Sequence, residues 1–164
     1  MKAGAMGKGA VWAFAFGAIV VTIVAAIIQS KLAVGTAVQA GVNLGLFGTM
    51  GYFGVYLTKA SKGQGIVAFL VSSLVFGVLV YVATTMFLGH VGAEAAVQAG
   101  ANADTARAAQ ALGSAAGGIA GAFLAVVGVI ISFLAGMIGC LIGGAAKNKA
   151  LGSGGSSPAR AAAA

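Results

Sequence analysis

The polar side chains inside the apolar runs of this sequence are amides and hydroxyls, and none of them is charged. Gln39 and Asn43 are four residues apart, so a helix would place both on one face. Thr84 and Thr85 lie near the end of another apolar run. If these four residues met, they would form a polar cluster open to one side of a membrane. Two interpretations stay open: a binding vestibule or pore mouth, or hydrogen bonds between neighbouring helices that fix their register.

Groups that commonly build enzyme and metal sites are scarce. His90 is the only histidine and Cys140 the only cysteine, and the two acids, Glu94 and Asp104, lie in the same short stretch as the histidine. One histidine without a neighbouring Cys or His is no metal site. The glycine-containing segments 51–54 and 63–65 are not followed by the Gly-Lys-Ser/Thr that completes a phosphate loop. The sequence therefore predicts no catalytic, cofactor or metal residues and a protein that is not an enzyme.

The composition indicates a membrane protein. Of 164 residues, 60% are hydrophobic and 7% are charged, and the mean hydropathy is +1.07. Soluble domains carry about 25% charged residues, which is far more. Apolar runs of this length suit helices, which need about 20 residues to cross a bilayer, rather than alternating barrel strands of about 10. We therefore expect an all-α integral membrane four-helix bundle, with spans near residues 10–28, 36–58, 66–88 and 115–145.

The polar segments between and after these spans predict the rest of the organisation. Residues 1–146 form the transmembrane domain, and residues 147–164, rich in Gly, Ser and Ala, form a flexible cytoplasmic tail. Residues 89–114 form an outer loop with two short helices separated by Gly100. The long last helix either projects outward or breaks near residues 113–118. Segments 37–43 and 96–102 resemble each other in sequence, which raises the alternative that the chain is a duplicated pair of helical hairpins.

The cations predict which way up the chain lies. With four spans, seven of them share one side: Lys2, Lys8, Lys59, Lys62, Lys147, Lys149 and Arg160. Short loops rich in Lys and Arg stay in the cytoplasm, so both termini are expected there, in the cytoplasmic (inner) membrane of a bacterium. The alternative for the first span is a cleaved signal peptide, although its apolar run is long for one. The net charge of +7 comes from cations dispersed at the ends of the spans, where they set the topology. They form no basic stripe with interleaved aromatics, so no nucleic acid is expected as a partner.

Small residues at steps of three and four predict tight helix packing. Lipid gives helices no hydrophobic reason to associate, and close approach across glycines supplies van der Waals contact instead. This face could pack within the chain or between subunits. Its glycines are Gly41 and Gly45 in the second span, and Gly113, Gly117, Gly121, Gly128 and Gly136 along the fourth.

The expected function follows from these features. Ion-driven carriers usually have an ionisable residue inside a span, and these spans have none, so we do not expect ion-driven transport. We expect a structural, accessory or scaffold subunit of a membrane assembly, whose partners are the lipid bilayer and itself or other membrane proteins. The alternative is a small channel or holin-like pore for uncharged or small solutes.

Overall fold

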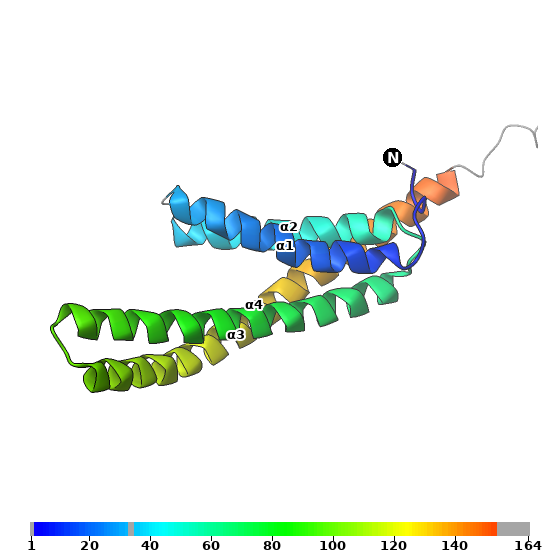
Figure 1. The fold of residues 1–164 in the computed structure, drawn as a ribbon. Helices are drawn as coiled ribbons and strands as arrows, with labels where there is room; N and C mark the ends of the chain where they lie inside the picture. The colour runs from blue at the N-terminus through cyan, green and yellow to red at the C-terminus, as the bar shows by residue number, and fades with distance from the viewer. Residues whose placement is uncertain (1, 33–34, 154–164) are drawn as a thin grey trace, which may run out of the picture. The chain divides into compact units, whose positions relative to one another are not determined.

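The chain is built from helices. The computed structural model describes residues 2–32 and 35–153, which contain α1 (Ala10–Lys31), α2 (Thr36–Tyr56), α3 (Lys62–Gln98) and α4 (Ala103–Ser153) (Figure 1). The chain divides into two compact units: unit 1 comprises Met1–Ser72 and Ser132–Ala164, and unit 2 comprises Ser73–Ile131. The expected all-α class is therefore confirmed.

Three of the described helices, α1, α3 and α4, are long and apolar enough to cross a membrane. The helix α2, 21 residues long, is not among them. Its five glycines, together with Gln39 and Asn43, keep its most apolar stretch below the hydropathy of the spans in the other three helices. Length is therefore no obstacle for α2, and composition is what sets it apart.

The segment expected to be an outer loop, residues 89–114, is helical almost throughout. Its first part continues α3 as far as Gln98 and its second part begins α4 at Ala103, so the connection is only residues 99–102. The two expected short helices are thus the ends of two long ones. Residues 89–98 contain no proline, and the Ala, Glu, Val and Gln of residues 93–98 favour helix although Gly89 and Gly92 before them do not.

Local hydrogen bonds explain why both helices end at this connection. Gly100 has φ +77° and follows α3; its N–H donates to Val97 O at 3.0 Å, and the N–H of Ala101 donates to Ala96 O at 3.1 Å. These two bonds make a Schellman motif, which glycine adopts without strain. Asn102 then caps α4, because its Oδ1 accepts from the N–H of Thr105 at 2.9 Å.

The helix α4 runs unbroken through residues 113–118 and continues to Ser153. Residues 147–153, expected to begin a flexible tail, are therefore helical, and residues 154–164 lie outside the described part of the chain. The resembling segments also differ in structure: residues 37–43 lie inside α2, whereas residues 96–102 contain the end of α3 and the turn. Their likeness is therefore not matched by a common secondary structure.

Unit 1 has a core made largely of small side chains. The helix α1 packs against α2 (Figure 1), and the Ser72 hydroxyl of α3 donates to Ala15 O of α1 at 2.6 Å. Only two large aromatic rings, Phe47 and Phe69, are fully buried among the described residues. The remaining buried hydrophobic residues of unit 1 are Val11, Ala15, Ala18, Ile19, Val55, Leu57, Ala60, Ala68 and Cys140.

Unit 2 consists of one antiparallel pair, the second half of α3 and the first part of α4 (Figure 1). The two helices approach so closely that a Cβ added to Gly117 would lie 3.0 Å from Thr85 Cα, and one added to Gly121 would lie 3.1 Å from Tyr81 O. None of the chain's fully buried hydrophobic side chains, among those described, belongs to this unit. Unit 2 is held by backbone proximity across small residues rather than by an apolar core.

Candidate functional site

The N-terminal segment and the α2–α3 connection together form the basic end of unit 1. Backbone bonds join them: the N–H of Gly4 donates to Tyr56 O, that of Met6 to Leu57 O, both at 2.9 Å, and that of Lys59 to Met6 O at 2.8 Å. The carbonyls at the end of α2 have no further turn to bond to. The N-terminal segment satisfies two of them and brings Lys8 close to the connection.

The start of α3 is fixed by a capping box. The Ser61 hydroxyl accepts from the N–H of Gln64 at 3.2 Å, and the Gln64 side-chain oxygen accepts from the N–H of Ser61 at 3.0 Å. The spacing Ser-x-x-Gln before an apolar run is the sequence signal for this motif. It sets the direction in which α3 leaves the connection, and with it the position of Lys62.

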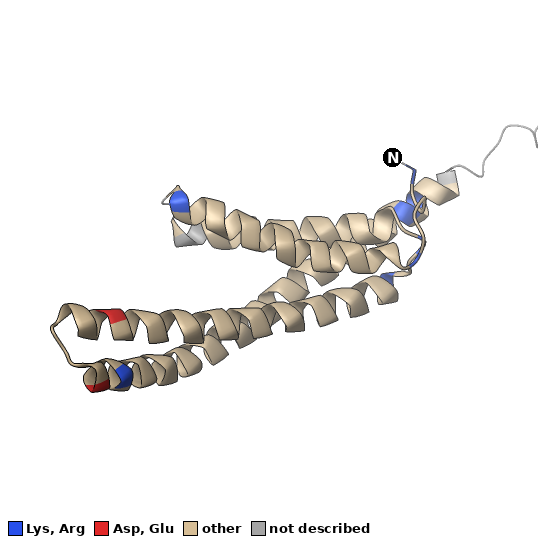
Figure 2. Cartoon of the chain, in the orientation of Figure 1, with Lys and Arg blue, Asp and Glu red and all other residues tan. Residues whose placement is uncertain are grey.

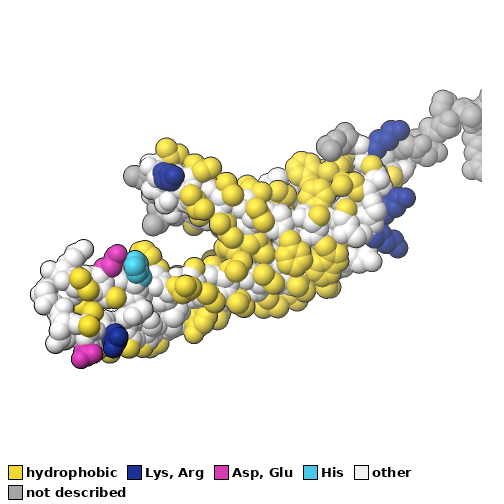
Figure 3. Space-filling view, in the orientation of Figure 1, with side chains coloured by type: hydrophobic (Ala, Val, Ile, Leu, Met, Phe, Trp, Pro, Cys, Tyr) yellow, Lys and Arg dark blue, Asp and Glu magenta, His cyan; other side chains and the backbone are white. Residues whose placement is uncertain are grey.

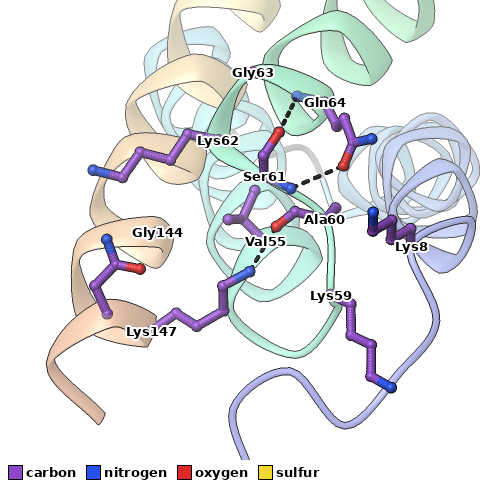
Figure 4. A pocket seen from close by; sticks show the side chains of 11 residues that line it. Lys8, Val55, Lys59, Ala60, Ser61, Lys62, Gly63, Gln64, Gly144 and Lys147 are labelled. Carbon is purple, nitrogen blue, oxygen red and sulfur yellow. Dashed lines mark hydrogen bonds between the residues drawn. The ribbon is translucent and has the colours of Figure 1, made fainter. Parts of the chain in front are cut away.

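A hollow of about 770 Å³ opens at this end of unit 1. Four lysines from four separate segments line it, and they lie on different sides of the Ala60–Ser61 backbone (Figure 4). The polar side chains of Ser61, Gln64 and Asn148 complete its lining. We call this feature the lysine hollow; its lysines are Lys8, Lys59, Lys62 and Lys147.

Lys147 has a structural role in the lysine hollow. Its ammonium group donates to Thr58 O at 3.1 Å and to Ala60 O at 2.6 Å (Figure 4). It therefore ties α4 to the carbonyls that follow α2, as a cation at a helix C-terminus can. Partial burial lowers the pKa of Lys147 below its ordinary value of 10.5. Two of the three N–H groups of this ammonium are used, and one remains.

The charge around the lysine hollow is one-sided. The chain has only two acidic residues, Glu94 and Asp104, and both belong to unit 2. There they pair locally, Glu94 with His90 at 3.1 Å and Asp104 with Arg107 at 3.7 Å, on exposed helix surface. Figures 2 and 3 show several lysines at one end of unit 1, whereas Lys31 lies at the opposite end of α1. No acidic side chain of unit 1 exists to neutralise them.

A second hollow, of about 600 Å³, adjoins the first. The two share Lys8, Ser61, Gly63 and Gln64 in their linings. The second is also lined by the apolar side chains of Val11, Trp12 and Val67. Trp12 is 40% exposed and stacks on Phe16 with ring centroids 6.2 Å apart. A basic hollow therefore lies beside an aromatic and apolar one.

The four residues of the expected polar cluster belong to different units. Gln39 and Asn43 lie in α2, within unit 1, and Asn43 Oδ1 is buried without a hydrogen-bond partner among the described residues. Thr84 and Thr85 lie in unit 2, where their hydroxyls donate to Val80 O at 2.8 Å and to Tyr81 O at 2.9 Å. Both threonines are thus satisfied by their own helix. A meeting of the two pairs stays a prediction.

The expected glycine face of α4 lies against other helices along much of its length. Gly113 approaches Leu88 and Gly89, and Gly136 lies against the Phe69 ring. Gly128 is looser, with Phe76 4.0 Å from the position of an added Cβ. In α2, a Cβ added at Gly41 or Gly45 would meet no described atom within 4 Å.

Among the glycines at the closest approach of α4 to α2, Gly139 is one that the helical spacing did not single out. Gly139 of α4 faces Gly48, and Gly143 faces Tyr52, so tightly that an added Cβ would overlap backbone atoms of α2. Gly51 of α2 lies in the same way against Gly136. Small residues recur in both helices, and only the three-dimensional register selects which of them meet.

The described residues contain no group of three or more His, Cys, Asp or Glu side chains that could hold a metal ion. Comparison of the chain with protein-family models, with curated proteins and with solved structures finds no match.

Proposed function

We propose that the chain is a four-span integral membrane protein with both termini in the cytoplasm, and that it acts as a non-enzymatic structural or accessory subunit of a membrane assembly. The bacterial cytoplasmic membrane is the location that fits its short, lysine-rich inner segments. The observation that carries the proposal is the apolar surface of its helices, which nothing within the described chain covers.

Unit 2 gives the clearest case. Ile119 is 78% exposed and Phe123 is 70% exposed, and Val126 and Ile130 continue the same stripe at helical spacing. Soluble monomers rarely expose contiguous apolar patches larger than a few hundred Å². A bilayer, or another membrane protein, supplies the missing cover. Apolar side chains are spread over the exposed helix faces (Figure 3), as this interpretation requires.

The charge-free spans and the glycine contacts support a structural role. Intramembrane ionisable residues mark most proton relays and ion pathways, and the spans contain no Asp, Glu, Lys or Arg. What the spans offer instead is close backbone packing within each unit, together with long apolar faces. Such faces suit association with other helices better than they suit chemistry.

The length of α3 and α4 adds a feature outside the bilayer. At about 1.5 Å per residue, the 51 residues of α4 extend about 76 Å, more than twice the hydrocarbon thickness of about 30 Å. In the proposed topology the excess includes residues 89–98 and 103–114, an antiparallel hairpin that contains both acids. This hairpin would project from the outer face, where a partner could reach it.

Topology is tested first, with single cysteines in a Cys140→Ala background. Ser61→Cys lies in the α2–α3 connection and Ala101→Cys in the α3–α4 connection. In intact cells a membrane-impermeant maleimide should label the cysteine at 101 and leave the one at 61 unlabelled, and inside-out vesicles should reverse the result. Labelling at position 61 from outside would contradict the four-span arrangement.

The structural role is tested with photo-crosslinking residues in native membranes. A crosslinker at position 119 or 123 should form adducts with protein, either a second copy or another membrane protein, while one at Val20, 60% exposed on α1, serves as a comparison site. Adducts with lipid alone at all three positions would argue against an accessory subunit.

A leak assay distinguishes a structural subunit from the alternative of a pore. Liposomes containing the purified chain and a small trapped dye should retain the dye. Release that falls when Gln39 and Asn43 are replaced by Leu would favour a channel lined by those amides.

A further inference from the structure

We propose that the lysine hollow binds the phosphate of an anionic phospholipid. The inference rests on the proposed membrane location and goes beyond it, because it assigns a defined lipid site to four named lysines rather than a general attraction to the bilayer surface.

The positive charge at the lysine hollow is uncompensated within unit 1. Four lysines line the hollow, and unit 1 contains no acidic side chain. Like charges at this density repel each other and lower the stability of the unit. An anion from outside the chain relieves that repulsion. A phosphodiester is the anion that an inner leaflet supplies in quantity, and each nearby lysine strengthens its attachment.

Several hydrogen-bond donors at the lysine hollow are held in place by the fold. Lys147 is fixed by its bonds to Thr58 O and Ala60 O, which leaves one N–H for a ligand. The capping box fixes Ser61 and Gln64, so the first turn of α3, with its unpaired N–H groups and positive dipole end, opens on the same hollow. A phosphate oxygen entering there meets donors that are already positioned.

The surface beside the lysine hollow favours a lipid over a dissolved phosphate. The adjoining hollow shares Lys8, Ser61, Gly63 and Gln64 with the lysine hollow and adds the apolar side chains of Val11, Trp12 and Val67. Trp prefers the boundary between headgroups and acyl chains. A phospholipid matches both hollows at once, with its phosphate among the lysines and its glycerol and upper acyl chain along Trp12. Inorganic phosphate would use only the first.

The test uses the fact that Trp12 is the only tryptophan. The full chain is reconstituted into phosphatidylcholine bilayers that contain a small fraction of lipid brominated near the top of its acyl chains, because bromine quenches tryptophan fluorescence on contact. The brominated lipid is either phosphatidylglycerol or phosphatidylcholine. Lipid is present in both leaflets, so the result does not depend on the orientation of the protein.

Brominated phosphatidylglycerol should quench Trp12 more than brominated phosphatidylcholine at the same mole fraction. Equal quenching by the two lipids would overturn the site while leaving the membrane location intact. No quenching by either would instead place Trp12 away from the bilayer and count against the proposed topology.

The lysines are tested with the double substitution Lys8→Gln and Lys59→Gln. Neither ammonium group makes a hydrogen bond to a described residue, so the fold should survive, which circular dichroism checks. The preference for phosphatidylglycerol should fall by about fivefold for each lysine removed. The matched control is Lys31→Gln, at the other end of α1, which should keep the preference. An unchanged preference in the double variant would overturn the assignment.

A last arm separates the two sources of phosphate. Inorganic phosphate added at the same ionic strength as a chloride control should leave the quenching by brominated phosphatidylglycerol unchanged. If inorganic phosphate abolishes the preference and chloride does not, the lysine hollow binds an aqueous phosphate and the lipid assignment is wrong.

Discussion

Replacement of Gly139 by alanine should separate α2 from α4. A Cβ at this position would overlap Gly48 O and lie 2.9 Å from both Gly48 C and Tyr52 N. All three are backbone atoms, so no rotamer change relieves the contact and a helix must move. Overpacking of this kind costs about 1–3 kcal/mol. Alanine also gains about 1 kcal/mol in helix propensity over glycine, so the net loss in the free energy of unfolding should be at most about 2 kcal/mol.

The matched control is Gly45→Ala in α2. It gains the same helix propensity, and its Cβ would meet no described atom within 4 Å. The difference between the two variants therefore isolates the steric cost at Gly139. Unfolding in mixed micelles, with a rising fraction of denaturing detergent and Trp12 fluorescence as the signal, measures it. If Gly139→Ala were as stable as Gly45→Ala, the close contact between α2 and α4 would not exist in the membrane-like environment.

Three further predictions concern other parts of the chain. Lys147→Gln should lower the free energy of unfolding by about 1 kcal/mol through its lost hydrogen bonds. Because the pKa of Lys147 is lowered in the folded chain, the unfolded chain keeps a proton that the folded chain has released just below pH 10.5, so the free energy of unfolding should rise with pH there. The substitution should remove this rise, which unfolding at several alkaline pH values would detect. Asn102→Ala should cost about 1 kcal/mol by uncapping α4, visible as faster hydrogen exchange in its first turn alone. Gly117→Leu should loosen unit 2 and speed amide hydrogen exchange in both its helices. Gly118→Leu should not, because a Cβ at Gly118 would lie 3.8 Å from the Tyr81 hydroxyl, an ordinary contact distance. Equal effects of the two substitutions would contradict the close contact at Gly117.

The helical class could be predicted from the sequence because hydropathy and charge act over whole segments. Apolar runs longer than 20 residues leave few solutions other than helices, and α1 begins at Ala10, the residue where its span was expected to begin. Helix ends depend on single residues instead. The sequence around Gly100 was correctly interpreted as a helix boundary, but the hydropathy fall after residue 88 was mistaken for the end of a helix, although alanine and glutamate extend a helix as readily as leucine does.

The lysine hollow could be predicted only in part. The sequence placed its lysines on one side of a membrane, since each lies next to a long apolar run. It gave no sign that Lys147 would reach back to Ala60, 87 residues earlier, because a hydrogen bond to a backbone carbonyl leaves no trace in residue type. The pairing of Gly48 with Gly139 was missed for a related reason: glycine is so frequent here that spacing alone does not select partners.

The helix α2 links these observations. It is the one described helix without a stretch apolar enough to count as a candidate span, and Gln39 and Asn43 make it costly to place in hydrocarbon. Yet it packs on α1 along its length and meets α4 at Gly48, Gly51 and Tyr52. In the proposed topology three of its five glycines, Gly48, Gly51 and Gly54, let α4 and α1 approach closely enough to shield that part of α2 from lipid. The stability of α2 in the bilayer then depends on α4, and α4 is in turn anchored by Lys147 to the carbonyls just beyond the end of α2. Substitutions at the two contacts should therefore have non-additive effects on the free energy of unfolding. The basic end of unit 1 and the glycine contacts then form one cooperative structure.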